Sequence, residues 1–380
     1  MADRVEAVPF DKHLVLVRDE HEIIVLNETA RLIWDEIADG AAAADVAGGI
    51  VERFGVPAER ARADVETALA DWRVRGLIGR PPSGGPAAPR PSAAGLPPPL
   101  DFATDRTYAL CGHPIRFRFQ DADAEGLIRP LLSPWETSAA AREVIDLYRD
   151  GDDHVMAADG AEIGRGRLAE DVLGLAIGQV LEVSYPDARW LAVLHAGAVA
   201  NRQHAIVMPG ASGSGKSTLT AALVASGLTY LSDDIVPLDG RTSRVLPVPL
   251  ASSLKQGSWS ALAARFSDLD RLPTHRDGGR ERRYLDLSAH ARDMAGGGVP
   301  VRALLFPRYR QSGSTRLETL RPGEALERIL HARCWISLDR ADLATTLQWV
   351  RDTPAYGIEF SCMDDAIALT RDLLMAISTS

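Results

Sequence analysis

A glycine-rich stretch, Gly210-Ala211-Ser212-Gly213-Ser214-Gly215-Lys216-Ser217, constrains the fold of this chain more than any other feature. It fits the pattern G-x-x-x-x-G-K-[S/T], in which backbone N–H groups surround nucleotide phosphates and the lysine reaches the terminal ones. The apolar run 205–208 before it predicts a buried strand, and the helical spacing of apolar residues after it predicts a helix that ends at Gly227. A phosphate site at a helix N-terminus requires this order of strand, loop and helix.

The sequence therefore predicts a binding site for a nucleoside triphosphate, with ATP and Mg²⁺ as the cofactors. Lysine use supports this prediction, because Lys12, Lys216 and Lys255 are the only lysines among 42 basic residues. A chain that favours arginine so heavily is expected to place a lysine where it needs a compact ammonium on a flexible stem. The alternative is an ordinary Gly/Ser turn that fits the pattern by chance. The expected nucleotide-binding residues are Gly210, Ser212, Gly213, Ser214, Gly215, Lys216, Ser217 and Thr218.

Two adjacent carboxylates, Asp233 and Asp234, end the apolar run that begins at Leu228. One helix and one return strand separate them from Lys216, so we expect the pair beside the glycine-rich loop. Phosphoryl transfer needs one carboxylate to hold Mg²⁺ and another group to accept the proton of the attacking hydroxyl. Because side chains of successive strand residues diverge, the two aspartates can divide these tasks. The alternative is a helix cap or a turn, which Asp-Asp often forms.

His195 lies within the apolar run 191–200, which is expected to form a hairpin with the strand that enters the loop. Doubly wound nucleotide-binding folds do not usually begin with such an antiparallel neighbour. The imidazole can orient an aspartate or raise its basicity through a hydrogen bond. It can equally be a core histidine whose hydrogen bonds are satisfied.

The segment Leu194-His195-Ala196-Gly197, the glycine-rich loop and Leu231-Ser232-Asp233-Asp234 together resemble the HPr kinase/phosphorylase family. The resemblance implies a mixed-sheet α/β fold related to phosphoenolpyruvate carboxykinase. It also implies that Ser217 binds Mg²⁺ and that an aspartate, supported by His195, deprotonates a protein serine. On this basis we expect Asp233 as the base and Asp234 as a second Mg²⁺ ligand. The family's later glycine-rich docking signature has no match here, so HPr itself and the phosphorylase reaction are not expected.

Residues 1–78 are expected to form a small α+β domain of winged-helix type. Apolar runs on both sides of a polar break in 14–26 predict a hairpin. Asn27 is a suitable N-cap for a helix that stops at Gly40, and two further helices follow, the third beginning at Pro57. Residues 76–78 are expected to return as a short strand.

This first domain resembles the PqqD family of peptide-binding domains through Leu26-Asn27-Glu28-Thr29-Ala30, Ile33-Trp34 and Arg75-Gly76-Leu77-Ile78. The resemblance implies that a leader peptide of a ribosomal precursor adds to the edge of the sheet. A DNA-binding winged helix is one alternative, but residues 1–80 carry 16 acidic and 10 basic side chains, which is unfavourable for a phosphate backbone. A purely structural cap on the second domain is another.

Residues 79–99 contain eight prolines and four glycines and are expected to be a linker. The second domain, 100–380, is expected to contain short strands at 107–110 and 115–119, and a helix near 139–148. It should continue with an amphipathic helix at 168–183, a buried strand at 301–306 ended by Pro307, and a largely helical remainder.

The segment Thr274–Tyr284 contains four arginines, Arg276, Arg280, Arg282 and Arg283, around Gly278-Gly279. A mobile loop of this composition can close over transferring phosphate and stabilise its charge. A solvated loop without a role is the alternative.

The net charge of −10 and a pI near 5.4 argue against binding to nucleic acid or to an anionic membrane. No transmembrane or signal segment and no metal-ligand spacing of the three cysteines is visible, so a cytoplasmic protein is expected. We therefore expect an ATP-dependent kinase that phosphorylates a hydroxyl, with serine favoured, of a ribosomal peptide or protein held by the first domain. A small-molecule kinase with a regulatory front domain and a nucleotide-gated peptide-binding protein are the alternatives, and the sequence leaves a homo-oligomer open.

Overall fold

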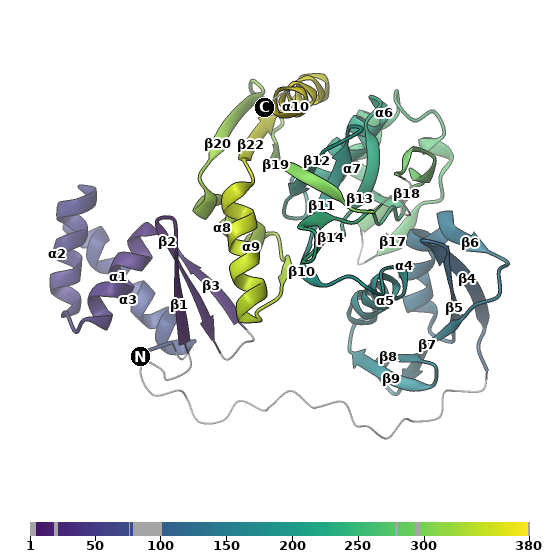
Figure 1. The fold of residues 1–380 in the computed structure, drawn as a ribbon, viewed down its shortest axis with the longest axis horizontal. Helices are drawn as coiled ribbons and strands as arrows, with labels where there is room; N and C mark the ends of the chain where they lie inside the picture. Colours follow the sequence, from purple (N-terminus) through teal and green to yellow (C-terminus); the bar gives the residue numbers. More distant parts are fainter. Residues whose placement is uncertain are drawn as a thin grey trace.

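The computed structural model describes residues 5–18, 22–75, 77–78, 101–277, 280–292 and 297–378. The expected linker, 79–99, lies outside the described residues. The fold is mixed α/β, with a small α+β domain at the N-terminus and three further sheets in the described part of 101–378 (Figure 1). No helix in the described part of the chain is both long enough and apolar enough to cross a bilayer.

The N-terminal domain has three antiparallel strands followed by three helices. Its elements are β1 (Val5–Phe10), β2 (His13–Arg18), β3 (Glu22–Leu26), α1 (Glu28–Ala38), α2 (Ala43–Phe54) and α3 (Ala58–Val74). The expected hairpin and N-cap are confirmed, since the Asn27 side chain accepts a hydrogen bond from the Ala30 N–H at 3.0 Å. Strand β1 is additional. The expected strand at 76–78 is wrong for the two described residues, because Leu77 and Ile78 form a bend that turns the Leu77 side chain into the core.

Residues 101–184 form a six-stranded sheet covered by two helices. These elements are β4 (Thr104–Leu110), β5 (His113–Phe119), β6 (Glu136–Thr137), β7 (Glu143–Asp150), β8 (Asp153–Ala158), β9 (Ala161–Gly166), α4 (Ala122–Leu132) and α5 (Ala169–Ser184). The strands expected at 107–110 and 115–119 and the helix at 168–183 are confirmed. The helix expected near 139–148 is wrong, because four successive buried residues of β7 pair in parallel with β5 and antiparallel with β8.

A ten-stranded mixed sheet forms the centre of the remainder. Its strands are β10 (Trp190–Leu194), β11 (Ala196–Ala200), β12 (Ala205–Pro209), β13 (Thr229–Asp233), β14 (Val236–Asp239), β15 (Arg244–Val245), β19 (Val299–Tyr309), β20 (Arg316–Leu320), β21 (Trp335–Ile336) and β22 (Ala355–Phe360). The hairpin of β11 and β12 is confirmed. Strand β19 continues through Pro307 to Tyr309 instead of ending there, because its pairing with β22 in this stretch is parallel and continuous.

The helices around this sheet are α6 (Lys216–Ala225), α7 (Gln256–Leu262), α8 (Pro322–His331), α9 (Arg340–Asp352) and α10 (Met363–Ser378). A separate three-stranded sheet contains β16 (Ser252–Lys255), β17 (His275–Asp277) and β18 (Arg280–Leu285). The arginine-rich segment is therefore an antiparallel pair of strands, with Gly278-Gly279 outside the described residues, and not an open loop. Its arginines have structural partners: Arg276 pairs with Glu281 at 3.1 Å, Arg282 donates a hydrogen bond of 3.4 Å to Ser253 Oγ, and Arg283 lies 3.9 Å from the Trp259 ring centroid.

The sheet of the N-terminal domain is covered on both faces, and its central strand β2 is buried on both. Because side chains alternate along a strand, Leu14 and Leu16 pack with α1–α3, whereas Val15 and Val17 join a hydrophobic cluster with α8 and α9. Figure 1 shows α8 and α9 lying beside β1–β3. The buried apolar residues that these two helices contribute to the cluster are Ala325, Leu326, Ile329, Leu343, Leu347, Trp349 and Val350.

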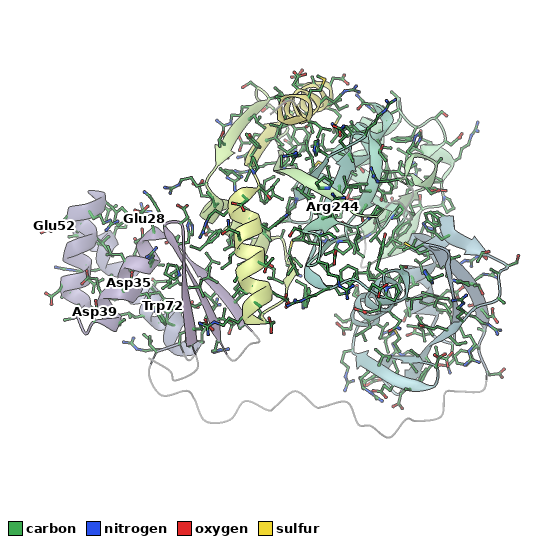
Figure 2. The ribbon with its side chains drawn as sticks, in the orientation of Figure 1. Glu28, Asp35, Asp39, Glu52, Trp72 and Arg244 are labelled. Atoms are coloured by element: carbon green, nitrogen blue, oxygen red, sulfur yellow. The ribbon has the colours of Figure 1, made fainter. Side chains whose placement is uncertain are left out.

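Polar contacts reinforce this interface between the N-terminal domain and α8 and α9. The His13 imidazole lies 3.8 Å from Glu327, and the Arg351 guanidinium lies 5.3 Å from the Phe10 ring centroid. Acidic side chains occupy the helices that face away from it: Figure 2 shows Glu28, Asp35 and Asp39 along α1 and Glu52 on α2.

Candidate functional site

Strand directions bring the sequence-predicted site residues to one edge of the central sheet. Strand β11 is antiparallel to both β12 and β13, so the carboxyl ends of β12 and β13 meet at the same edge. Gly210 follows β12 and Asp233 ends β13. His195 comes immediately before β11, so it lies at this edge as well. The carboxyl edge of a sheet beside a strand-to-helix turn is where ligands of α/β proteins usually bind.

The glycine-rich stretch forms the turn between β12 and α6. Gly213 and Gly215 have φ angles of 91° and 95°, a left-handed backbone that glycine adopts without strain. At Gly215 a side chain is also excluded by space, because a Cβ would lie 3.1 Å from the Phe360 ring and 3.2 Å from Tyr309 Cβ. Lys216, Ser217 and Thr218 form the first turn of α6. The expected strand, loop and helix are therefore present, with the helix N-terminus at the sheet edge.

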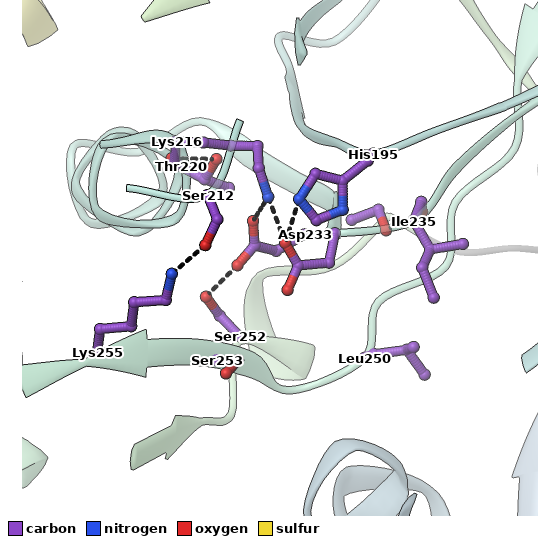
Figure 3. A network of polar contacts seen from close by, with 12 residues as sticks. His195, Ser212, Lys216, Thr220, Asp233, Ile235, Leu250, Ser252, Ser253 and Lys255 are labelled. Atoms are coloured by element: carbon purple, nitrogen blue, oxygen red, sulfur yellow. Dashed lines mark hydrogen bonds and ion pairs between the residues drawn. The ribbon is translucent and has the colours of Figure 1, made fainter. Parts of the chain in front are cut away.

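The close approach of β11 to α6 fixes the position of Lys216. A Cβ on Gly197 would lie only 2.0 Å from Thr220 Oγ1 and 3.5 Å from Lys216 Cγ. Only glycine permits this spacing, and it holds the lysine over the ends of β11 and β13. The Lys216 side chain is 5% exposed and donates a hydrogen bond to Asp234 (Figure 3). Burial alone would lower its pKa, but the charges of Asp234 and Asp233 outweigh burial and raise it.

Both aspartates turn toward the same ammonium group. Lys216 Nζ lies 3.9 Å from Asp233 Oδ1 and is hydrogen-bonded to Asp234 Oδ1. The expected divergence of successive strand side chains is wrong here, because Asp234 lies just beyond the end of β13 and has a left-handed φ of 72°. A left-handed backbone is uncommon for residues other than glycine, and aspartate is among the types that tolerate it.

Asp233 is buried in a polar pocket of its own. Ser252 Oγ donates a hydrogen bond of 2.6 Å to Asp233 Oδ2, and the Ser217 hydroxyl is close enough to stabilise the anion as well. The other oxygen, Oδ1, is buried and has no hydrogen-bond partner among the residues that the structure describes. Burial and the neighbouring Asp234 charge raise the pKa of Asp233 to about 6, against the opposing influence of Lys216 and the two hydroxyls.

Asp234 has the opposite electrostatic character, and its side chain is 34% exposed. Burial acts to raise the pKa of Asp234, but the Lys216 ammonium, with smaller contributions from His195 and Arg282, holds it below its ordinary value. His195 Nε2 lies 3.8 Å from Asp234 Oδ1. Burial and the Lys216 charge lower the pKa of His195 although Asp234 acts to raise it, so the imidazole is neutral at pH 7.

Three neighbours of the site were not among the residues predicted from the sequence. Lys255 Nζ donates a hydrogen bond to Ser212 Oγ in the glycine-rich loop, and its pKa is lowered by burial and then by the nearby arginine charges of β18. Ser252 holds Asp233, and Cys334 Sγ accepts a hydrogen bond of 3.2 Å from the His195 N–H. The scarcity of lysine was a signal for Lys255, whereas Ser252 and Cys334 come from distant segments and had no local signal.

Metal-binding capacity at this edge comes from carboxylate and hydroxyl oxygens. Within the described residues, no group of three or more His, Cys, Asp or Glu side chains is arranged as a metal site. The oxygens of Ser217, Asp233 and Asp234 are the ones that suit a hard cation, and the unpartnered Asp233 Oδ1 is the oxygen that would gain most from one.

By its architecture the chain is a mixed α/β protein that carries a small α+β domain at its N-terminus. Residues 13–78 of that domain match the family described as "Coenzyme PQQ synthesis protein D (PqqD)". This part of the chain is therefore a PqqD-like domain, of a family that recognises peptides in the biosynthesis of ribosomally made, modified peptides. No curated protein matches the chain.

Proposed function

We propose that this protein is an ATP-dependent kinase that phosphorylates a serine hydroxyl of a ribosomal peptide or protein recruited by its PqqD-like domain. The proposal rests on one observation above all. A lysine at a helix N-terminus, two aspartates and a neutral histidine converge behind a glycine-rich turn in a chain that also carries a peptide-recognition domain.

The glycine-rich turn and the start of α6 suit a chain of phosphates. Free N–H groups at a helix N-terminus and the Lys216 ammonium favour anionic oxygens. The Lys216 ammonium, which is hydrogen-bonded to the Asp234 carboxylate, is the group that a phosphate oxygen on the turn would contact. The resemblance to HPr kinase-related proteins supports the same assignment, with Gly210 to Thr218 as the nucleotide-binding segment.

The donor set at the acidic pair fits Mg²⁺, which usually binds one or two protein oxygens together with phosphate and water oxygens. We propose Ser217 and Asp234 as its ligands. A bound Mg²⁺ would neutralise charge that develops on the phosphate oxygens. Asp234 suits this role because its lowered pKa keeps it ionised.

The chemical step follows from the proton affinity of Asp233. The oxygen of the acceptor hydroxyl forms a bond to the γ-phosphorus, the bond from that phosphorus to the β-phosphate oxygen breaks, and ADP leaves. The hydroxyl proton passes to the Asp233 carboxylate, whose pKa of about 6 is suited to accepting it near neutral pH. Ser217, the other proposed Mg²⁺ ligand, lies beside Asp233, whereas His195, the residue expected to support the base, lies beside Asp234. Each of these residues is therefore closer to the aspartate that has the other role. The alternative mechanism to test is therefore the one in which Asp234 is the base and Asp233 binds Mg²⁺.

The PqqD-like domain supports a peptide as the acceptor. In the described sheet, β3 pairs only with β2, which leaves a backbone edge to which an extended peptide can add. The Arg75 side chain, at the end of α3, lies 3.5 Å from Glu22 at the start of this edge.

Mass spectrometry of peptides incubated with the protein, ATP and Mg²⁺ tests the proposal. Candidate precursor peptides encoded beside this chain should gain one phosphate on serine, and the Lys216→Ala variant should lose this transfer and most of its ATP affinity. Thermal unfolding of the variant must show that it is folded, because removing Lys216 leaves the buried Asp233 carboxylate and the half-buried Asp234 carboxylate without their cation. Phosphorylation of free serine or of a sugar in place of the peptide would favour a small-molecule kinase. ATP binding without transfer to any acceptor would favour a nucleotide-gated binding protein.

A further inference from the structure

A cavity of about 350 Å³ opens beside the glycine-rich turn, on the side away from the acidic pair. In the central sheet, β12 has β11 and then β13 on one side, with Asp233 at the end of β13. On its other side it has β19 and then β22, both parallel to it. The carboxyl ends of β19 and β22 thus reach the same edge of the sheet as the loop, and the cavity lies over them.

The walls of this cavity combine loop, strand ends and one helix. Pro209, Gly210, Ala211 and Ser214 form the wall shared with the glycine-rich turn. Strands β19, β20 and β22 contribute apolar surface and three charged side chains, and α8 and the turn after it close the opposite wall. The remaining lining residues are Phe306, Pro307, Arg308, Glu318, Arg328, His331, Ala332, Gly357, Ile358 and Glu359.

We propose that this cavity binds the base and ribose of the nucleotide whose phosphates lie on the glycine-rich turn. This inference rests on the proposed function. Lys216, Asp233 and Asp234 would lie beside the terminal phosphate on the β13 side of the turn. The base and ribose of the same nucleotide would then extend toward β19 and β22 on the other side. The volume falls within the usual range for small-molecule sites, roughly 300–1,000 Å³.

The chemistry of the walls matches a planar heterocycle with hydrogen-bonding edges. The Arg328 guanidinium lies 5.8 Å from the Phe306 ring centroid and donates a hydrogen bond of 3.1 Å to Glu318. A base in this cavity would stack on the guanidinium plane, since arginine stacks well on aromatic rings. Glu318 and Glu359 supply acceptors for exocyclic amino groups or ribose hydroxyls.

Gly357 keeps this space open at the centre of β22. A Cβ at that position would lie 2.6 Å from Glu318 Oε1 and 2.8 Å from Arg328 Nη1, so any side chain displaces both groups. Gly357 has no left-handed backbone, so its role here is to provide room and not to permit a turn. Glycine in the interior of a strand often marks a site where a ligand or another backbone approaches closely.

Calorimetric titration of the full-length protein with ATP and with inorganic tripolyphosphate, both with Mg²⁺, tests the inference. Tripolyphosphate carries the phosphates without the nucleoside. The variants are Arg328→Ala, which removes the stacking group, and Gly357→Val, which fills the space without altering charge. Arg321→Ala is the matched control, because this exposed arginine lies at the opposite end of α8 and does not line the cavity.

We expect each cavity variant to bind ATP about tenfold more weakly, equivalent to about 1.4 kcal/mol, with unchanged affinity for tripolyphosphate. The control should bind both ligands as the unmodified protein does. The inference is wrong if both folded cavity variants bind ATP with unchanged affinity, or if they lose equal affinity for ATP and for tripolyphosphate. Neither result would contradict the proposed kinase function. If the unmodified protein binds neither ligand, the phosphate site itself is wrong and the inference falls with it.

Discussion

The Asp233 carboxyl is the group whose titration should control the reaction. Its raised pKa means that it is protonated below about pH 6 and available as a base above it. We therefore expect kcat/KM for phosphoryl transfer to rise with pH, with a midpoint of about 6, and to level off above it. A His195→Gln variant should keep a midpoint in the profile, because the midpoint is assigned to Asp233 and burial and the Lys216 charge lower the pKa of His195. A profile that is flat on both sides of pH 6, or that loses its midpoint in the histidine variant, would show that another group is the base.

The two aspartates should respond differently to the same substitution. Asp233→Asn removes the proton acceptor, so we expect transfer to be lost while ATP and Mg²⁺ still bind. Asp234→Asn removes a metal ligand, so we expect a higher Mg²⁺ requirement with partial activity at saturating Mg²⁺. Asparagine also tolerates the left-handed backbone at position 234, which keeps the comparison free of strain. Titrating Mg²⁺ against transfer rate in each variant separates the two roles, and the opposite pattern would exchange them.

Helix α8 links the front domain to the cavity beside the glycine-rich turn. Its N-terminal half contacts β2 through Gly323 and Glu327, and its last residues line the cavity. The approach at Gly323 is very close, since a Cβ there would lie 2.0 Å from His13 Nδ1 and 2.5 Å from Cε1. The packing of the first domain therefore depends on the absence of one side chain.

Gly323→Ala should destabilise the protein by about 1–3 kcal/mol because the new methyl group collides with the His13 ring. His13→Ala provides space, so the double variant should recover part of this loss, which a double-mutant cycle of thermal unfolding measures. Gly126→Ala is the matched control, since that helical glycine has no atom within 4 Å of an added Cβ. If the losses of unfolding free energy in Gly323→Ala and His13→Ala simply add in the double variant, the contact between Gly323 and His13 is refuted.

At the scale of the molecule, the two parts are less independent than the proline-rich segment suggests. Removing residues 1–99 would expose the apolar faces of α8 and α9 that Phe10, Val15 and Val17 cover. We expect the truncated protein to be less stable and prone to aggregation, besides having a higher KM for a peptide acceptor. Light scattering and thermal unfolding measure the first effect, and a peptide titration measures the second.

Cleavage within residues 79–99, without removal of the first domain, is the control for this truncation. A protease site introduced within 79–99 leaves the interface intact, so the two fragments should elute together after cleavage and keep their activity. Fragments that separate freely, with a stable and monodisperse C-terminal part, would mean that the interface contributes little to stability.

Local patterns predicted the local structure well, and pairing between distant segments limited the rest. The strand, turn and helix around Lys216 follow from glycine positions and apolar spacing, because each depends on neighbouring residues. The helix expected near 139–148 failed because β7 is stabilised by β5 and β8, which the sequence window does not contain. The left-handed turn at Asp234, which brings both carboxylates to one ammonium, had no signal beyond the residue type. The burial of both faces of β2 did have a signal in the sequence. Strand β2 is apolar at four successive positions, Leu14 to Val17, as strands buried on both faces are.

Because helices cover both faces of the β1–β3 sheet, both sets of helices would affect which peptides such a protein selects. A strand that adds to the edge of this sheet projects alternate side chains toward opposite faces, so one row meets α1–α3 and the other meets α8 and α9. The surface that selects a peptide would then be formed by α1–α3, which precede residues 79–99, and by α8 and α9, which follow them. Grafting a front domain from another protein would transfer only half of that surface, and retargeting by module exchange would have to carry α8 and α9 along with it.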